Sequence, residues 1–220
     1  MDRFYTAESV TEGHPDKLCD QIADSVLDDC LAHDPLSRVA CEVLATRNHI
    51  VVAGEITSHH VPRVPAIIES LMHDIGYSTR GLTIDLLLHR QSSDIAAGVN
   101  NPLEEREVIG TGELGAGDQG VMVGFACSET PEMLPLPVVL AHRICRLLDE
   151  EPLRGAGVDG KAQVTVSYSS GTPAAVTAVV ASVQHAKDAD LDALRRDVES
   201  RIIRRAIPAD LLTKETRLLI

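Results

Sequence analysis

The stretch RVACEVLATRNHIVVAGEIT, residues 38–57, decides the fold. Its two halves, 38–46 and 49–57, are rich in β-branched and apolar residues, and a short polar link at Arg47 and Asn48 joins them. Two such runs with so short a link predict a β-hairpin. Apolar and polar residues do not alternate cleanly in the second half, so we expect a sheet that is buried on both faces and packs against another domain or subunit.

The segments on either side of this hairpin predict two helices and two more strands. Residues 16–32 place their apolar side chains on one helical stripe, and residues 63–75 form a second helical pattern that Gly76 closes. Residues 4–10 before the first helix and 81–89 after the second are typical of strands. The first part of the sequence therefore has the element order βαββαβ.

A similar order of elements returns in the second part of the sequence. The expected elements are a strand at 120–129, a helix at 132–150, a hairpin of 161–169 and 174–184, a helix at 189–206 and a closing strand at 216–220. The sequence thus predicts an α/β fold of the two-layer α+β type, built from repeated βαββαβ units. We expect domains at 1–90 and 119–220, joined by a mobile loop at 91–118. Because the chain stops inside the last expected strand, we also expect a split or cut protein.

Composition argues against several classes of function. Acidic residues outnumber basic ones by 33 to 20, which gives a formal charge of -13, and aromatic residues make up 2% of the chain. This charge repels polyanions and few rings are available to stack on bases, so no nucleic acid partner is expected. No apolar run reaches membrane-spanning length and no secretory signal is recognisable, so no membrane is expected. Five cysteines without a C-x-x-C pair favour the reducing cytoplasm.

The sharpest local motif is EGHPDK, residues 12–17, at the expected junction between the first strand and the first helix. Unpaired N–H groups and the helix dipole favour an anion at such a junction. His14 or Lys17 can donate hydrogen bonds to phosphoryl oxygens, and Asp16 can hold a magnesium ion. The alternative is that Asp16 caps the helix while His14 and Lys17 are simply solvated. Taken alone, these six residues favour this second interpretation.

Three further places carry polar side chains that suit a ligand. In GAGDQG, residues 115–120, the glycines permit a close approach of the backbone, so that Asp118 can bind a nucleoside; the alternative is a loop that needs positive φ angles. Glu42 and Glu55 have apolar neighbours in the expected strands, where an unpaired carboxylate is costly, although either can also lie on a wet face. Lys161 is either a phosphate contact or an exposed lysine at the start of a strand.

Taken together and in order, several segments resemble S-adenosylmethionine synthetases along nearly the whole chain. They are TAESVTEGHPDK (6–17), ACEVLAT (40–46), VVAGEIT (51–57), QSSDIAAGV (91–99), GAGDQGVMVGFA (115–126), DGKAQV (159–164) and IPADLLTKET (207–216). The resemblance implies a methionine adenosyltransferase, in which the sulfur of L-methionine attacks C5′ of ATP and expels the triphosphate, which is then cleaved to pyrophosphate and phosphate. It implies Mg²⁺ and K⁺ as cofactors.

The resemblance also implies roles for individual residues. The expected ATP-binding residues are His14, Lys17, Asp118, Asp159 and Lys161, and His14 and Lys161 are also expected to be catalytic. The expected ligands of the other groups are Asp16 for Mg²⁺, Glu42 for K⁺, and Glu55 and Gln91 for L-methionine. Glu8 matches a site position without a defined role, and residues 91–118 would gate the pocket.

The sequence departs from the family pattern in two ways. Mild departures are Ser92-Ser93-Asp94 where a proline is usual, Ala97 for a glutamine and Phe125 for a tyrosine. More seriously, the third unit of the family, with its cationic clamp for the triphosphate, is absent. We therefore expect one subunit of a split enzyme with a complementing polypeptide that carries the C-terminal domain, and a homo- or hetero-oligomer that pairs through flat sheet faces. The alternative is a non-catalytic or regulatory binding subunit, or a fragment.

Overall fold

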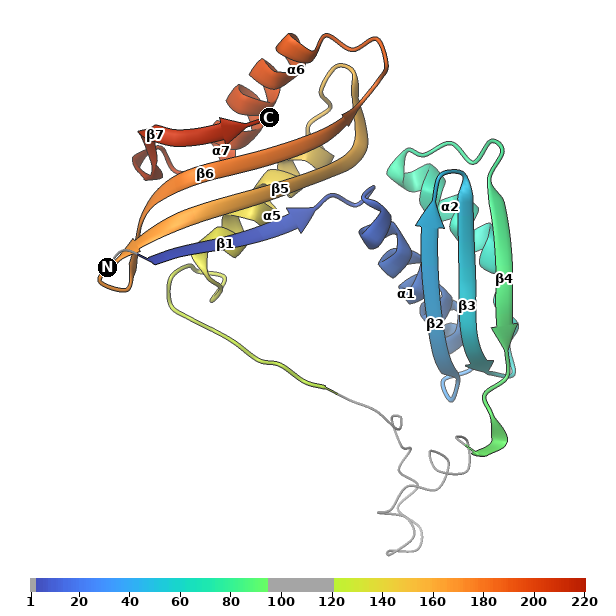
Figure 1. Ribbon diagram of the computed structural model, residues 1–220. Helices are drawn as coiled ribbons and strands as arrows, with labels where there is room; N and C mark the ends of the chain where they lie inside the picture. The colour runs from blue at the N-terminus through green and yellow to red at the C-terminus, as the bar shows by residue number, and fades with distance from the viewer. Residues whose placement is uncertain (1–2, 95–120) are drawn as a thin grey trace, which may run out of the picture. The chain divides into compact units, whose positions relative to one another are not determined.

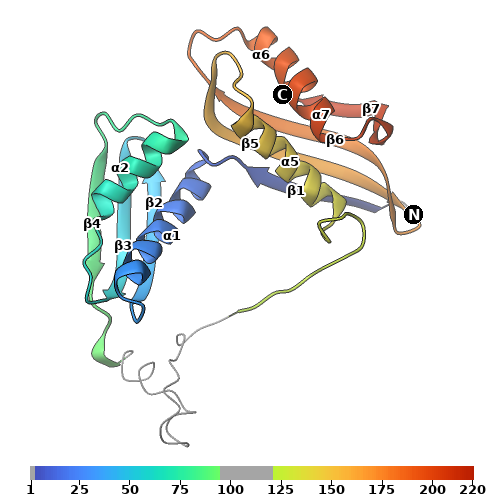
Figure 2. The same cartoon turned by 180° about the vertical axis from the view of Figure 1, so that it is seen from behind.

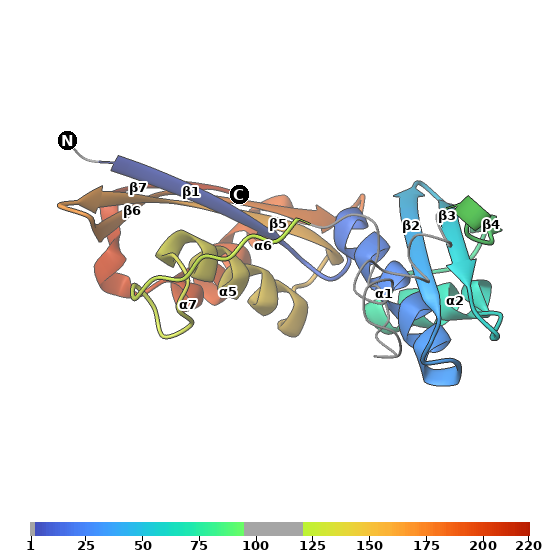
Figure 3. The ribbon, with the colours of Figure 1, turned by 90° about the horizontal axis from the view of Figure 1, so that it is seen from below.

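The computed structural model of the chain describes residues 3–94 and 121–220, which form two compact units. Unit 1 comprises Met1–Leu18, Glu69–Arg80 and Phe125–Ile220, and unit 2 comprises Cys19–Ile68 and Gly81–Gly124. In each unit, helices cover one face of a sheet, so both have the expected two-layer α/β architecture (Figure 3). The domain limits at 1–90 and 119–220 stay a prediction, because the contacts join segments that are not continuous in sequence. Most of the predicted loop 91–118 lies outside the described residues.

Unit 2 is organised around the hairpin that the sequence predicts. Its elements are most of α1 (Pro15–His33), β2 (Arg38–Thr46), β3 (His49–Thr57), the first part of α2 (Val64–Ile75) and β4 (Thr83–His89). Residues 15–18 of α1 and 69–75 of α2 belong to unit 1. Strands β2 and β3 pair antiparallel through a two-residue turn in which Asn48 has a φ of 54°, and β4 pairs parallel to β3. The order βαββαβ of the first part of the sequence is confirmed, and the predicted limits of the hairpin strands match the observed ones.

One face of the β2–β3–β4 sheet is covered by α1 and α2 (Figures 1 and 2). Side chains from these helices and from β3 form the buried core of this layer; they are Ile22, Val26, Cys30, Ile50, Val52, Val64 and Ile68. On the opposite face, Leu44 and Leu87 are 66% and 61% exposed. No described residue covers this second face, so its packing against another domain or subunit stays a prediction.

Unit 1 contains a sheet of four strands in the order β1–β5–β6–β7. The elements of this unit are β1 (Arg3–Val10), α5 (Leu136–Glu150), β5 (Ala156–Ser169), β6 (Thr172–His185), α6 (Leu191–Asp197), a π-helical segment (Val198–Ile203), α7 (Arg204–Ala206), a 3-10 turn (Ala209–Leu211) and β7 (Leu212–Leu219). Strands β5 and β6 form a long antiparallel hairpin, and Ser170 and Gly171 both take positive φ at its tip, as a tight turn between twisted strands requires.

The core of unit 1 lies between this sheet and the helices α5, α6 and α7 (Figure 2). Alternate residues of β5 are buried against the helices, as a sheet with one covered face requires. Leu140 and Ile144 from α5, with Ile202 from the π-helical segment, meet Val164 and Val179 from the sheet, and all five are fully buried. Among residues 3–94 and 121–220, no helix is both long and apolar enough to cross a membrane.

Two features of unit 1 differ from what the element order suggested. The predicted strand at 120–129 is wrong, because the described part, from Val121 onward, has no strand, and Val121 and Met122 are 92% and 97% exposed. An apolar run forms a strand only where a neighbouring strand offers its backbone groups, and β1 occupies the place beside β5. Strand β1 thus joins the sheet of the second half of the chain, which the order along the sequence does not reveal.

Candidate functional site

The EGHPDK motif lies where β1 passes into α1, at one end of the unit 1 sheet. Strands β1 and β5 are antiparallel, so the last residue of β1, Val10, is the partner of Lys161 near the start of β5. Pro15 is the first residue of α1, a position that favours proline, and Asp16 lies in the first turn of this helix. The pairing therefore brings the two predicted phosphate-contacting segments, 12–17 and 159–161, to the same end of one sheet.

A set of buried hydrogen bonds fixes the junction to β5. Thr11 is buried, and its backbone N–H donates to the carbonyl oxygen of Gly160 over 3.0 Å. The N–H of Gly160 donates to Thr11 Oγ1 over 2.7 Å, and Thr11 Oγ1 donates to the carbonyl oxygen of Val158 over 2.8 Å. From unit 1's segment 69–80, Tyr77 Oη donates to the carbonyl oxygen of Gly13 over 2.6 Å. These bonds hold the backbone next to His14 in a defined position.

The imidazole of His14 is oriented by the backbone that follows it. The N–H of Asp16 donates to His14 Nδ1 over 3.2 Å, and Asp16 Oδ2 lies 3.7 Å from the same nitrogen. Because Nδ1 accepts a hydrogen bond, the neutral ring carries its proton on Nε2. The His14 side chain is 20% exposed whereas that of Asp16 is 87% exposed. The junction thus presents a donor on a partly buried ring beside a carboxylate that solvent reaches.

The lysine predicted to bind phosphate forms an ion pair across the strands. Lys161 Nζ lies 2.9 Å from Glu8 Oε2, and both side chains are about half exposed. Asp159 lies two residues earlier on β5 and, after burial, is the second cause that raises the pKa of Tyr77. Lys17 is exposed in the first turn of α1. The five predicted site residues of unit 1, with Glu8, are therefore gathered where β1 ends and β5 begins; they are Glu8, His14, Asp16, Lys17, Asp159 and Lys161.

Sequence reasoning missed a carboxylate beside this junction. A pocket of about 450 Å³ is lined by Ser9, Glu12, Lys17, His142 and Asp149, among others. The backbone N–H of Glu12 donates to Asp149 Oδ2 over 3.4 Å. Part of Asp149 remains exposed, but desolvation of its carboxyl group raises its pKa to about 6. The signal available in the sequence was an acidic run at the C-terminal end of a helix, where the helix dipole disfavours negative charge.

We predict that Asp149→Asn makes unit 1 more stable at neutral pH and not at acidic pH. Since the folded-state pKa of about 6 exceeds the ordinary value of 3.8, the carboxyl group contributes stability that is fully present below pH 3.8 and is lost as pH rises through about 6. Asparagine resembles the protonated form at every pH. In thermal unfolding of both proteins, the midpoint difference should be largest at about pH 8 and fall to a small part of that difference at about pH 4. A midpoint difference that does not change with pH would contradict the raised pKa of Asp149 as its cause.

The remaining predicted site residues lie in unit 2 or outside the described residues. Glu55 on β3 and Glu42 on β2 share the sheet face that no described residue covers, and Glu55 Oε1 lies 3.8 Å from His89 Nδ1. Gln91 follows β4, and its side-chain Oε1 is buried without a hydrogen-bond partner among the described residues. Asp118 falls outside them. The roles of Glu42, Glu55 and Gln91 stay predictions.

The fold and the junction define a class of protein. It is a two-layer α/β protein in which hydrogen-bond donors, ammonium groups and carboxylates meet at a helix N-terminus, an arrangement suited to an anionic ligand with a hard cation.

Comparison with known proteins shows to which family the chain belongs. Residues 2–97 match the family model for the N-terminal domain of S-adenosylmethionine synthetase, and residues 113–220 match the model for its central domain. The chain is 47% identical to the S-adenosylmethionine synthase of Roseiflexus castenholzii over 97% of its length, and 44% identical to that of Desulforudis audaxviator over 99%. The chain belongs to the S-adenosylmethionine synthetase family. It spans 57% and 58% of the length of these two relatives.

Proposed function

We propose that this chain supplies the N-terminal and central parts of a methionine adenosyltransferase, which forms S-adenosylmethionine from ATP and L-methionine and releases pyrophosphate and phosphate. The observation that carries the proposal is the match of both domains along nearly the whole chain, together with a junction whose motif residues are all present. We further propose that the part of the site that its relatives carry beyond these two domains comes from a second polypeptide, so that this chain acts as one subunit of a split enzyme.

The chemistry of the reaction explains why the junction carries these residues. A thioether sulfur needs no general base, so catalysis depends on alignment and on stabilising the charge of the departing triphosphate. In the proposal, His14 donates from Nε2 to a triphosphate oxygen and Lys161 places its ammonium group on the same anion. Lys17 adds a third cationic or donor group at the helix N-terminus, where the backbone dipole has the same sign. Asp159 and Asp118 contact the nucleoside side of ATP.

The residues at the junction fit the proposed magnesium ion. The carboxylate of Asp16 is 87% exposed, which leaves space for the water molecules that Mg²⁺ retains when it bridges a protein to phosphate groups. A bound ion would supply positive charge to the leaving triphosphate. Glu42 offers an exposed carboxylate oxygen on the unit 2 sheet face, which suits K⁺ as a hard cation.

Two residues of unit 2 fit the proposed methionine contacts. The Gln91 side-chain oxygen is buried and has no donor among the described residues, so it is prepared to accept a hydrogen bond from an ammonium group. Glu55 is partly buried on β3 and carries a carboxylate of the sign that such a group needs. A binding or regulatory subunit is the alternative function, and it would keep these contacts without turnover. All five cysteines are free, which is consistent with the proposed cytoplasmic location.

The decisive experiment measures formation of S-adenosylmethionine by the chain alone and by the chain mixed with a polypeptide that carries the C-terminal part of the Roseiflexus castenholzii synthase. ATP, L-methionine, Mg²⁺ and K⁺ are present in both assays. If the proposal is right, these residues alone give no product and the mixture turns over, because the added polypeptide completes the cationic surroundings of the triphosphate. The natural partner, once found, replaces the surrogate.

Two further measurements distinguish the proposed enzyme from a binding or regulatory subunit. Omission of Mg²⁺ should abolish turnover in the mixture. If no mixture turns over while the chain still binds ATP, the binding-subunit function is favoured. Turnover by the chain alone would overturn the split enzyme. Mass measurement at micromolar concentration tests the proposed oligomer, since a monomer would count against pairing through the sheet faces.

A further inference from the structure

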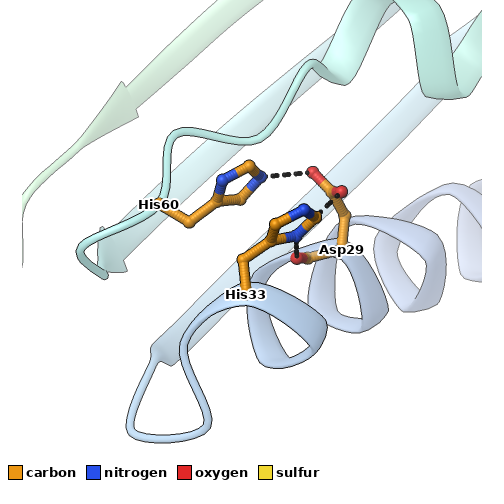
Figure 4. Close-up of side chains that lie close together, drawn as sticks. All are labelled: Asp29, His33 and His60. Atoms are coloured by element: carbon orange, nitrogen blue, oxygen red, sulfur yellow. Dashed lines mark hydrogen bonds and ion pairs between the residues drawn. The ribbon is translucent and has the colours of Figure 1, made fainter.

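Three side chains that the proposed reaction does not use meet at one end of unit 2. Asp29 and His33 lie one turn apart on α1, and His60 comes from the segment between β3 and α2 (Figure 4). One oxygen or nitrogen atom from each residue lies within 4.8 Å of the corresponding atoms of the other two. We propose that these three residues form a binding site for a divalent transition-metal ion such as Zn²⁺.

The donor set suits that class of ion. Two imidazoles and one carboxylate are typical ligands of Zn²⁺ and its neighbours, whereas Mg²⁺ and Ca²⁺ prefer oxygen ligands alone. His60 Nε2 lies 2.9 Å from Asp29 Oδ2, so the possible ligand atoms of two of the three residues are already adjacent.

The ring of His33 is held by a backbone hydrogen bond in the absence of an ion. His33 Nδ1 donates to the carbonyl oxygen of Asp29 over 2.8 Å, which leaves the lone pair on Nε2. The His33 and His60 rings are stacked, with centroids 4.0 Å apart and planes 9° from parallel. Stacked rings do not aim their nitrogens at one point, so the 56% exposed His33 side chain would turn on binding and give up its hydrogen bond to the Asp29 carbonyl oxygen.

The segment that carries His60 is held against the end of α1 by a second network. Asp34 is buried, and its Oδ2 accepts the backbone N–H of His59 over 2.8 Å and the hydroxyl of Ser58 over 3.3 Å. Ser58 Oγ also accepts from Ser37 over 2.7 Å and from the N–H of His60 over 2.9 Å. His60 is thus positioned before any ion arrives, which lowers the entropic cost of binding.

Charge at this end of α1 favours a cation. The carbonyl groups of the last helical turn give the C-terminus a partial negative charge, and Asp28, Asp29 and Asp34 add carboxylates nearby in sequence. A divalent ion held by Asp29, His33 and His60 would link the end of α1 to the segment that follows β3.

The test uses the whole chain, freed of metal with a chelator, and titrates it with Zn²⁺ by calorimetry at neutral pH in the presence of excess Mg²⁺. We expect one Zn²⁺ per chain at micromolar concentration. His33→Gln and His60→Gln should each weaken binding at least about 10-fold. The matched control His73→Gln replaces an 89% exposed histidine that also has an aspartate beside it, and it should bind as the parent chain does.

Two further measurements separate binding at these three residues from binding elsewhere on the chain. Co²⁺ should give visible absorption without the near-ultraviolet charge-transfer band of a thiolate ligand, because that band would place the ion on cysteines instead. Zn²⁺ should raise the thermal midpoint of the parent chain and of His73→Gln, and not that of His33→Gln, whose exposed position leaves the metal-free fold unchanged. The proposal is overturned if the two ligand variants bind Zn²⁺ as the parent does, or if the parent binds none at micromolar concentration.

Discussion

His14→Asn in the complemented enzyme is expected to lower turnover by about 10²–10³-fold, as the loss of one donor to a developing anion does in other enzymes. The binding of ATP should change much less. In the proposed mechanism, the Nε2 donor of His14 meets an anion whose charge grows as the triphosphate departs, so the contact would strengthen towards the transition state. The Asp16 N–H and the bonds at Thr11 and Tyr77 hold the ring in place for this contact.

The measurements for His14→Asn are the single-turnover rate and the dissociation constant of ATP, determined on the same mixture with the complementing polypeptide. His73→Asn is the control, because His73 is a surface histidine with its own aspartate neighbour and lies away from the motif residues in sequence. A loss in ATP binding as large as the loss in rate would mean that His14 binds the ground state and the transition state equally. Unchanged turnover would remove His14 from the mechanism.

Local sequence signals were sufficient for most elements of the fold. The hairpin of β2 and β3 combines β-branched residues with a short polar turn, and both signals act over a few residues. Helix α1 was recognisable from the spacing of Leu18, Ile22 and Val26, which are all buried. Residues close together in the sequence determine such elements, so local sequence patterns were sufficient to predict them.

Long-range pairing was not predictable from the same signals. The apolar run that begins at Val121 reads as a strand, but a strand needs a partner edge, and the edge of β5 is taken by β1 from the other end of the chain. The same pairing, Val10 with Lys161, is what brings EGHPDK to β5. Asp149 was missed for a related reason, since only the folded chain places its carboxyl group at the N–H of Glu12.

Gly13→Ala is expected to destabilise unit 1 by about 1–3 kcal/mol, the usual cost of forcing an additional carbon into a packed site. A Cβ at position 13 would lie 2.5 Å from the carbonyl oxygen of Val158 and 2.7 Å from its carbonyl carbon and Cγ2. Two of these three atoms belong to the backbone of β5, so the alanine must push the loop away from the strand. The same movement would displace the neighbouring His14, so turnover in the complemented enzyme should fall as well.

The free energy of unfolding of Gly13→Ala, measured by urea denaturation, tests this packing against two companions. Gly124→Ala is the matched control, because a Cβ at Gly124 meets no atom within 4 Å, and its stability should equal that of the parent chain. The double variant Gly13→Ala, Val158→Ala should recover little stability, since it removes Cγ2 and leaves the carbonyl group of residue 158 in place. Full recovery in the double variant would show that the side chain, rather than the backbone of β5, sets the need for glycine. The close approach of the two backbones would then no longer explain why the motif reads EGHPDK.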